Sequence, residues 1–337
     1  MVNSNKKTPA PVYLGLDIGG SFVKYGVVDA DGGVLFSSRA ATAQEGNPGS
    51  LLKILRTVTT EMVDHSLSRG FQPRAMGIGS PGTVNPRSGK VTGVSPNLPG
   101  WVNVELRTPF AEFGLPVAVD NDANCSAYAE FKYGAGVGIQ NAIVITLGTG
   151  IGSGIVIDGR LYHGAHFSGA ELGHTSINSR GPACGCGNRG CLETYASAGA
   201  ILRRAARLAG FYPNSAMAQI DFSAPGDTPL AGVFRAARNK DLAAVELLST
   251  IADDLAVGLA NILNAFDPEI LVLGGGIADA APEFIADVIR RTRHLSFKTS
   301  APKTKLAVAK LGNRAGFVGA AALAAELAGN NSARKTC

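Results

Sequence analysis

A strand, glycine-turn, strand pattern occurs twice in this chain, about 130 residues apart. Residues 12–35 read as an apolar strand, a glycine turn carrying Ser21, a second apolar strand and a tight Asp-Gly turn. Residues 141–161 repeat that order, with Thr149 in the place of Ser21. One copy alone would be weak evidence, but each copy opens a segment long enough for a domain, which favours duplication over chance. The repeat therefore predicts two related lobes.

The remaining segments alternate between expected strands and helices, which is typical of the α/β class. A chain of 337 residues is too long for one compact core, and this again favours two lobes. A loop rich in proline and glycine is expected at 79–101, and a loop-rich stretch at 211–229. The expected helices lie near 51–67, after Asp122, near 197–208 and at 242–266, and the further strands lie at 75–78, at 117–119 and from 269 to a run of glycines.

Composition and charge exclude several protein classes. The net charge of +5 is a mild bias, and the basic groups near 203–207 and 290–293 fit solvated helix faces, so no nucleic-acid partner is expected. No apolar stretch follows the basic N-terminal residues, and no apolar run approaches the ~18 residues of a membrane span. Five cysteines, three of them clustered, do not form a secreted disulfide framework. The sequence therefore predicts a cytoplasmic protein without a membrane partner.

One histidine and three cysteines fall within the eighteen residues from His174 to Cys191. Clustered thiolates repel one another unless a cation neutralises them, and His174, Cys184, Cys186 and Cys191 would fill the tetrahedral shell that zinc prefers. Four protein ligands indicate a closed, structural site. Two carboxylates, Glu171 and Glu193, flank this cluster, so the metal could also fix a polar pocket.

The glycine turns of the two copies are candidate phosphate-binding loops. Glycines let backbone N–H groups approach a phosphate, a hydroxyl adds a donor, and Asp17 could hold Mg²⁺. Each turn alone could be a plain hairpin, and neither is a Walker A loop, but two facing turns, one per lobe, would grip a polyphosphate chain. The candidate residues for this role are Asp17, Gly19, Gly20, Ser21, Lys24, Gly148, Thr149 and Gly150.

A third glycine run, at 273–277, follows the expected strand that begins at Glu269. Gly275 and Gly276 could let an adenine or ribose pack against the backbone. A helix-capping turn is an equally good explanation of this run alone.

The segment 119–125, VDNDANC, joins an expected strand to an expected helix. Asp122 could act as a general base, because a carboxylate close to a sugar hydroxyl can accept its proton, and Asn121 could bond a second hydroxyl. Taken alone, the segment is better explained as an N-cap, since Asp and Asn commonly begin helices.

Two stiff loops, at Ser80 and at Ser95, contain proline and glycine, and the second could present Asn97 to a ligand. Trp101 is expected to anchor this loop rather than to stack on a ligand. His65, His163 and His166 have no cysteine or carboxylate at ligand spacing, so they are interpreted as ordinary polar residues.

Taken together, these motifs resemble the ROK family of sugar kinases, most closely its bacterial glucokinase branch. The resemblance runs from about Tyr13 to Ala321. DIGGS at 17–21 is similar to the family's first phosphate loop, and LGTGIGSGI through ELGH is similar to its signature segment. CGCGNRGCLE is similar to its zinc motif, with His174 as fourth ligand, and GNRAGFVGAA to its closing helix.

The resemblance implies an actin-like, ribonuclease-H-like ATPase fold with two duplicated lobes. The expected N-terminal lobe comprises 1–122 and 314–337, with the last helix returning to it, and the expected C-terminal lobe comprises 123–313. The resemblance also implies ATP with Mg²⁺ as phosphoryl donor, the 6-hydroxyl of a hexose as acceptor, and a homodimer or dimer of dimers. Asp122 would be the base, and the residues implied to bind the hexose are Gly82, Asn97, Asn121, Asp122, Glu171, His174 and Glu193.

The chain departs from the family pattern in two respects. Ser21 stands where the family usually has Thr, which keeps the hydroxyl. Family repressors carry an N-terminal helix-turn-helix, whereas the first strand here is expected about eleven residues in, so no DNA-binding domain is expected.

Glucose is the favoured acceptor, because GPACGCGNRGCLETYAS is most similar to the glucokinase branch. N-acetylglucosamine, N-acetylmannosamine, fructose and mannose remain alternatives, as does polyphosphate in place of ATP. A non-catalytic sugar-sensing regulator is a further alternative, although the intact Asp122 and both glycine turns argue against it. A purely structural zinc protein would explain the cysteine cluster and nothing else.

Overall fold

The computed structural model describes residues 9–42, 47–93, 95, 98–224, 228–299 and 302–335. The chain forms two compact units. Unit 1 comprises Met1–Val137, Leu161–Gly169 and Asn313–Cys337, and unit 2 comprises Gly138–Arg160 and Ala170–Gly312. Among the described residues, no helix has the length and apolar character needed to cross a membrane.

Unit 1 is built on a five-stranded sheet in the order β3-β2-β1-β4-β7. The first three strands form an antiparallel meander, and β1 and β4, like β4 and β7, pair in parallel. Their apolar residues pack against α1 to make one hydrophobic core. The strands are β1 (Ala10–Ile18), β2 (Phe22–Val28), β3 (Val34–Ala41), β4 (Phe71–Ser80) and β7 (Val117–Asn121), and the helices are α1 (Pro48–Ser68), α2 (Asp122–Tyr133) and α9 (Ala315–Lys335).

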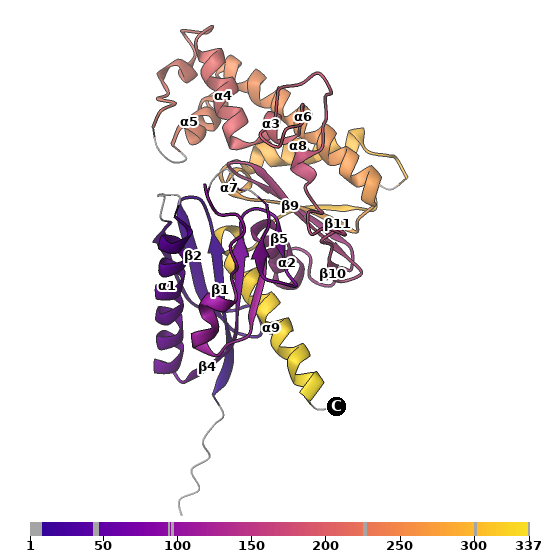
Figure 1. Cartoon of the computed structure of the whole chain (residues 1–337). Helices are drawn as coiled ribbons and strands as arrows, with labels where there is room; N and C mark the ends of the chain where they lie inside the picture. Colours follow the sequence, from indigo (N-terminus) through magenta and orange to yellow (C-terminus); the bar gives the residue numbers. More distant parts are fainter. Residues whose placement is uncertain are drawn as a thin grey trace, which may run out of the picture. The chain divides into compact units, whose positions relative to one another are not determined.

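The C-terminal helix α9 packs directly on β1, β4 and α2. Figure 1 shows it in yellow beside the indigo and purple strands of unit 1. Glycines make this approach possible, because a Cβ at Gly15 would lie 1.9 Å from the Phe317 carbonyl oxygen and one at Gly77 would lie 1.8 Å from the Ala320 carbonyl oxygen. The last helix therefore belongs to unit 1.

Unit 2 repeats the plan of unit 1, with a five-stranded sheet in the order β10-β9-β8-β11-β12. Again a meander of three strands is extended by two parallel strands. The strands are β8 (Ala142–Leu147), β9 (Ile151–Ile157), β10 (Arg160–Leu161), β11 (Ile270–Gly274) and β12 (Lys305–Val308). The helices are α3 (Glu193–Ala196), α4 (Ala198–Ala209), α5 (Thr228–Arg238), α6 (Leu242–Phe266), α7 (Gly276–Ala280) and α8 (Pro282–Leu295).

The repeated glycine turns lie at equivalent places in the two sheets, between β1 and β2 and between β8 and β9. Because the two sheets share one strand order, the predicted α/β fold with duplicated lobes is confirmed. The long helix at 242–266 was also predicted correctly: the Asp241 side chain caps its start and Asp267, with φ 42°, ends it.

The division of the chain differs from the expected boundary between 122 and 123. Unit 1 extends to Val137, because α2 packs against α9 and the Tyr128 hydroxyl donates to Glu326 at 2.7 Å. Residues 161–169 also belong to unit 1, although the chain on both sides of them belongs to unit 2. The expected loop at 79–101 contains the short strands β5 (Val84–Asn85) and β6 (Lys90–Val91).

Candidate functional site

The corner between β7 and α2 holds the candidate base. Asn121 is the N-cap of α2, and its side-chain oxygen accepts from the N–H groups of Ala123 and Asn124 at 2.9 and 3.1 Å. The same amide donates to the Gly82 carbonyl at 3.1 Å. Asp122 follows in the first helical turn, half-buried, and its Oδ1 accepts from the Ala123 N–H at 2.9 Å. The N-cap explanation is thus confirmed for Asn121. The carboxylate of the next residue, Asp122, is held by its bond to the Ala123 N–H.

The structure describes the loop at Ser80 fully and the loop at Ser95 only in part. Gly82 lies next to the Asn121 amide with φ 85°, where a Cβ would come within 2.8 Å of the Gly93 carbonyl oxygen. Asn97 lies outside the described residues. Trp101 is buried, and its indole N–H donates to the Ser80 hydroxyl at 2.9 Å, so it anchors the loop as predicted.

Thr42 fixes the first glycine turn, between β1 and β2, by two hydrogen bonds. Its hydroxyl donates to the Gly19 carbonyl at 2.8 Å and its backbone N–H donates to the Ser21 carbonyl at 2.9 Å. Ser21 is exposed, as a phosphate-binding hydroxyl must be. Lys24 lies opposite Asp17 across the β1–β2 pair, with its Nζ 3.5 Å from the Asn313 side-chain oxygen.

Asp17 lies near the end of β1, beside the start of α9, where a Cβ at Gly316 would lie 2.4 Å from its carboxylate. Desolvation and the negative charge of Asp122 raise the pKa of Asp17 from its usual 3.8 to about 7, and Lys24 opposes the shift. A carboxylate that is costly to ionise without a counter-charge fits a Mg²⁺ ligand.

Asp17→Asn should therefore stabilise the magnesium-free protein. Because the pKa of Asp17 is higher in the folded than in the unfolded protein, the free energy of unfolding falls as the pH rises from 3.8 towards about 7. The upper bound of this loss of stability is about 4 kcal/mol. Solvent contact at the half-buried carboxylate reduces this figure. We expect urea unfolding without Mg²⁺ to show a larger gain for the variant at pH 8 than at pH 5. An equal gain at both values would contradict the raised pKa, and the exposed Asp31→Asn change is the control.

The four predicted zinc ligands converge in unit 2. Their ligand atoms all lie within 4.8 Å of one another. His174 Nδ1 lies 3.5 Å from Cys184 Sγ, and Cys186 Sγ lies 3.7 Å from Cys191 Sγ. A tetrahedral zinc with Zn–S of about 2.3 Å and Zn–N of about 2.05 Å places its ligands about 3.6 Å (N to S) and about 3.8 Å (S to S) apart. The cluster therefore fits zinc, and its three cysteines are free of disulfide bonds.

Backbone hydrogen bonds beside the four predicted zinc ligands join the segments that carry the two flanking carboxylates. The Leu192 N–H donates to the Thr175 carbonyl at 3.0 Å, and the Ile177 N–H donates to the Gly190 carbonyl at 2.9 Å. These bonds join the segment of Glu171 and His174 to the segment of Cys191 and Glu193. Desolvation by burial raises the pKa of Glu171, and the negative charge of Glu193 adds to the shift.

Glu193 also reaches the second glycine turn. Its Oε2 accepts from the Ile151 N–H at 2.9 Å, and a Cβ at Gly150 would lie 2.4 Å from that oxygen. Thr149 is exposed at the tip, and Gly148 faces open space. Gly275, with φ 88°, packs on the backbone of Leu147 just before this turn, and Gly276 beside it also faces open space. The structure thus brings the predicted phosphate and adenosine glycines of unit 2 together.

Comparison with known proteins identifies the family. Residues 13–327 match the ROK family. The chain belongs to the ROK family. A glucokinase of Streptomyces coelicolor is 36% identical over 93% of this chain and 97% of its own length. The crystal structure of a ROK glucokinase from Streptomyces griseus in complex with glucose and AMPPNP has a TM-score of 0.80, at 34% identity over 94% of this chain and 99% of that chain.

The ROK family also includes regulators. A xylose repressor of Caldicellulosiruptor bescii is 30% identical to this ROK chain, over 92% of this chain and 77% of the repressor. Family membership therefore gives the fold and a sugar-related role, and the choice between transfer and sensing depends on the site residues.

The pairing of His163 with Asp120 in this ROK protein is not visible in the sequence. His163 was interpreted as an ordinary polar residue, yet its Nε2 lies 2.7 Å from Oδ2 of the buried Asp120. The two residues are 43 positions apart and share no motif, so no signal in the sequence connects them.

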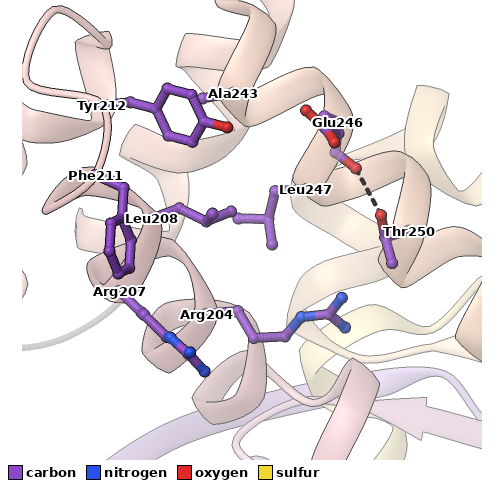
Figure 2. A pocket seen from close by; sticks show the side chains of 9 residues that line it. All are labelled: Arg204, Arg207, Leu208, Phe211, Tyr212, Ala243, Glu246, Leu247 and Thr250. Carbon is purple, nitrogen blue, oxygen red and sulfur yellow. Dashed lines mark hydrogen bonds between the residues drawn. The ribbon is translucent and has the colours of Figure 1, made fainter.

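A separate cavity of about 390 Å³ lies in unit 2 between the end of α4 and the start of α6. Figure 2 shows Phe211 and Tyr212 on one side of it and Glu246 and Thr250 on the other. It contains none of the predicted site residues, and Arg204 at its edge already pairs with Asp254 at 2.7 Å. This cavity is not the candidate active site of the ROK protein.

Proposed function

We propose that this protein transfers the terminal phosphoryl group of ATP to the 6-hydroxyl of a hexose, with glucose as the preferred acceptor. The observation that carries the proposal is the half-buried Asp122, whose carboxylate is oriented by the Ala123 N–H in a chain of the ROK family. Relatives at 33–36% identity that match this chain over nearly their whole length are named glucokinases.

Asp122 accepts the proton of the attacking hydroxyl in this proposal. A positioned carboxylate can remove that proton as the oxygen attacks, and phosphoryl transfer otherwise depends on positioning and charge neutralisation. Asn121 can still donate one amide hydrogen to a sugar hydroxyl, because its other bonds use the side-chain oxygen and a single N–H. Gly82 and Asn97 belong to the same proposed hexose site.

Glu171, His174 and Glu193 supply the remaining hexose contacts. The Nδ1 atom of His174 faces the thiolates, so Nε2 is the ring atom that would bond a hydroxyl. Zinc would fix the orientation of this imidazole, as a metal fixes its ligands, and would take no part in the transfer itself. A site that pairs each hydroxyl penalises an epimer that cannot form the same bonds.

The phosphates of ATP are assigned to the two glycine turns and the adenosine to the glycines that precede α7. Asp17 would hold Mg²⁺, which would neutralise the charge on the phosphates. At the first turn, the phosphate would be bound by Lys24, by the backbone N–H groups of Gly19 and Gly20 and by the hydroxyl of Ser21. At the second turn, it would be bound by Gly148, Thr149 and Gly150. Gly275 and Gly276 complete the proposed nucleotide site. Assembly as a homodimer or a dimer of dimers stays a prediction.

A panel of sugars tests the acceptor. We expect ATP-dependent turnover of glucose at a kcat/KM at least about tenfold above that of N-acetylglucosamine, N-acetylmannosamine, mannose or fructose, a difference of about 1.4 kcal/mol. Equal or faster turnover of an N-acetylated sugar would overturn the glucose assignment. The same panel with polyphosphate in place of ATP tests the donor.

A sugar-sensing regulator without transfer activity is the second candidate, because the xylose repressor is also a relative. It predicts saturable glucose binding with no sugar-dependent ADP formation. Calorimetry with glucose and the ADP assay together separate the two functions.

A further inference from the structure

The pair formed by His163 and Asp120 lies directly beside the proposed catalytic corner. Asp120 is the residue before Asn121, at the end of β7, and its side chain is 4% exposed, whereas that of His163 is 23% exposed. His163 Nε2 and Asp120 Oδ2 are 2.7 Å apart. The hydrogen bond to Asp120 raises the pKa of His163 and burial opposes the shift, so the charged imidazolium is favoured.

Asp120 uses its other oxygen to hold the corner itself. Oδ1 accepts from the Asn121 N–H at 2.7 Å and from the Asn124 side-chain amide at 2.9 Å. A buried carboxylate needs such partners on both oxygens, since losing one leaves a charge that water does not reach. Without His163, Oδ2 would lose its donor, and the carboxylate that accepts from the Asn121 N–H would be held from one side only.

The segment that carries His163 is built to keep one conformation. The Gly169 N–H donates to the His163 carbonyl at 2.9 Å and closes a loop, and the Arg87 guanidinium lies 5.4 Å from the centre of the Phe167 ring. Phe167, with φ 60°, is held in the left-handed region, a strained state for a bulky residue that persists only when its surroundings determine it. His163 therefore reaches Asp120 from a fixed support.

We propose that His163 is a positioning residue for the hexose-kinase reaction, acting through the Asp120 carboxylate to fix the orientation of Asn121 and Asp122. This inference rests on the proposed function. His163 itself contacts neither substrate in this account. A purely structural ion pair is the competing explanation, and it predicts lower stability with unchanged kinetics at temperatures well below unfolding.

Kinetics of three variants distinguish these explanations. His163→Ala should lower kcat/KM for glucose about tenfold or more, with a lower kcat and a higher glucose KM, while the ATP KM stays within about twofold. His163→Gln, whose amide can donate to Asp120, should recover activity to within about threefold of wild type. His166→Ala changes an exposed histidine three residues away on the same loop and is the matched control.

A double-mutant cycle with Asp120→Asn adds a second readout. If His163 acts through Asp120, the double variant His163→Ala/Asp120→Asn should be no slower than the slower single variant. Normal kinetics of His163→Ala despite a lower Tm, an equal loss in His166→Ala, or additive losses in the cycle would overturn the inference and leave the proposed function intact. A wild-type protein that phosphorylates no hexose would instead refute the proposed function, and this inference with it.

Discussion

Asp122→Asn should lower kcat for glucose by about 10³-fold, because a general base of this kind contributes roughly 10²- to 10⁴-fold. Asparagine keeps the volume and the oxygen that accepts from the Ala123 N–H, so the start of α2 should stay intact. The loss should therefore fall on kcat, with glucose affinity changed by less than about tenfold. Steady-state kinetics, with glucose binding measured separately by calorimetry, check both parts.

The exposed Asp31→Asn change in the same unit is the matched control for Asp122→Asn. It should leave kcat within about twofold of wild type. Activity of Asp122→Asn within threefold of wild type would show that another group accepts the proton. A lowered Tm in Asp122→Asn would indicate instead that the carboxylate serves mainly to begin the helix.

Loss of the zinc site should lower the thermal stability of the protein. Cys184→Ser replaces a buried ligand and should reduce the bound zinc from about one equivalent to nearly none. Burial raises the pKa of the Cys191 thiol, so without a cation this thiol stays protonated and the remaining ligands are no longer cross-linked by a metal. We expect Tm to fall by about 5–10 °C, since the loss of a structural metal costs about 3 kcal/mol in a unit of this size.

Hexose binding should weaken before nucleotide binding in the zinc-free protein. The four zinc ligands lie on the segments that carry Glu171 and Glu193, so without zinc these carboxylates should be held less firmly. The glucose KM should then rise at least about tenfold while the ATP KM changes by less than about threefold. Metal analysis, calorimetry and kinetics on one preparation test this order. Arg189→Ala, at an exposed position in the same loop, should keep its zinc. Normal glucose affinity in a metal-free Cys184→Ser protein would contradict the scaffold role.

The sequence predicted the parts of the fold that depend on local pattern. The strand and glycine-turn repeat gave the two sheets, because each copy contains a central strand and its hairpin partner. The spacing of His174 and the three cysteines was sufficient to predict that the four ligand atoms converge, since all of them lie on one short segment. The helix at 242–266 had capping residues at both ends.

The features that were missed depend on contacts between distant segments. Compact unit 1 extends past residue 122 to Val137, because the position of α2 depends on α9, almost 200 residues later, where a Cβ at Gly319 would lie 1.7 Å from the Cys125 carbonyl oxygen. The interaction of His163 with Asp120 required the loop at 161–169 to belong to unit 1. The bond between Glu193 and the Ile151 N–H likewise joins two motifs that lie 42 residues apart in the sequence.

The most direct test of the central claim is to identify the product formed from glucose and MgATP. Phosphorus NMR on the wild-type reaction should show one glucose 6-phosphate for each ADP, and the same reaction with Asp122→Asn should show almost none in the same time. ADP formation without a sugar phosphate, or no turnover with any hexose of the panel, would contradict the account.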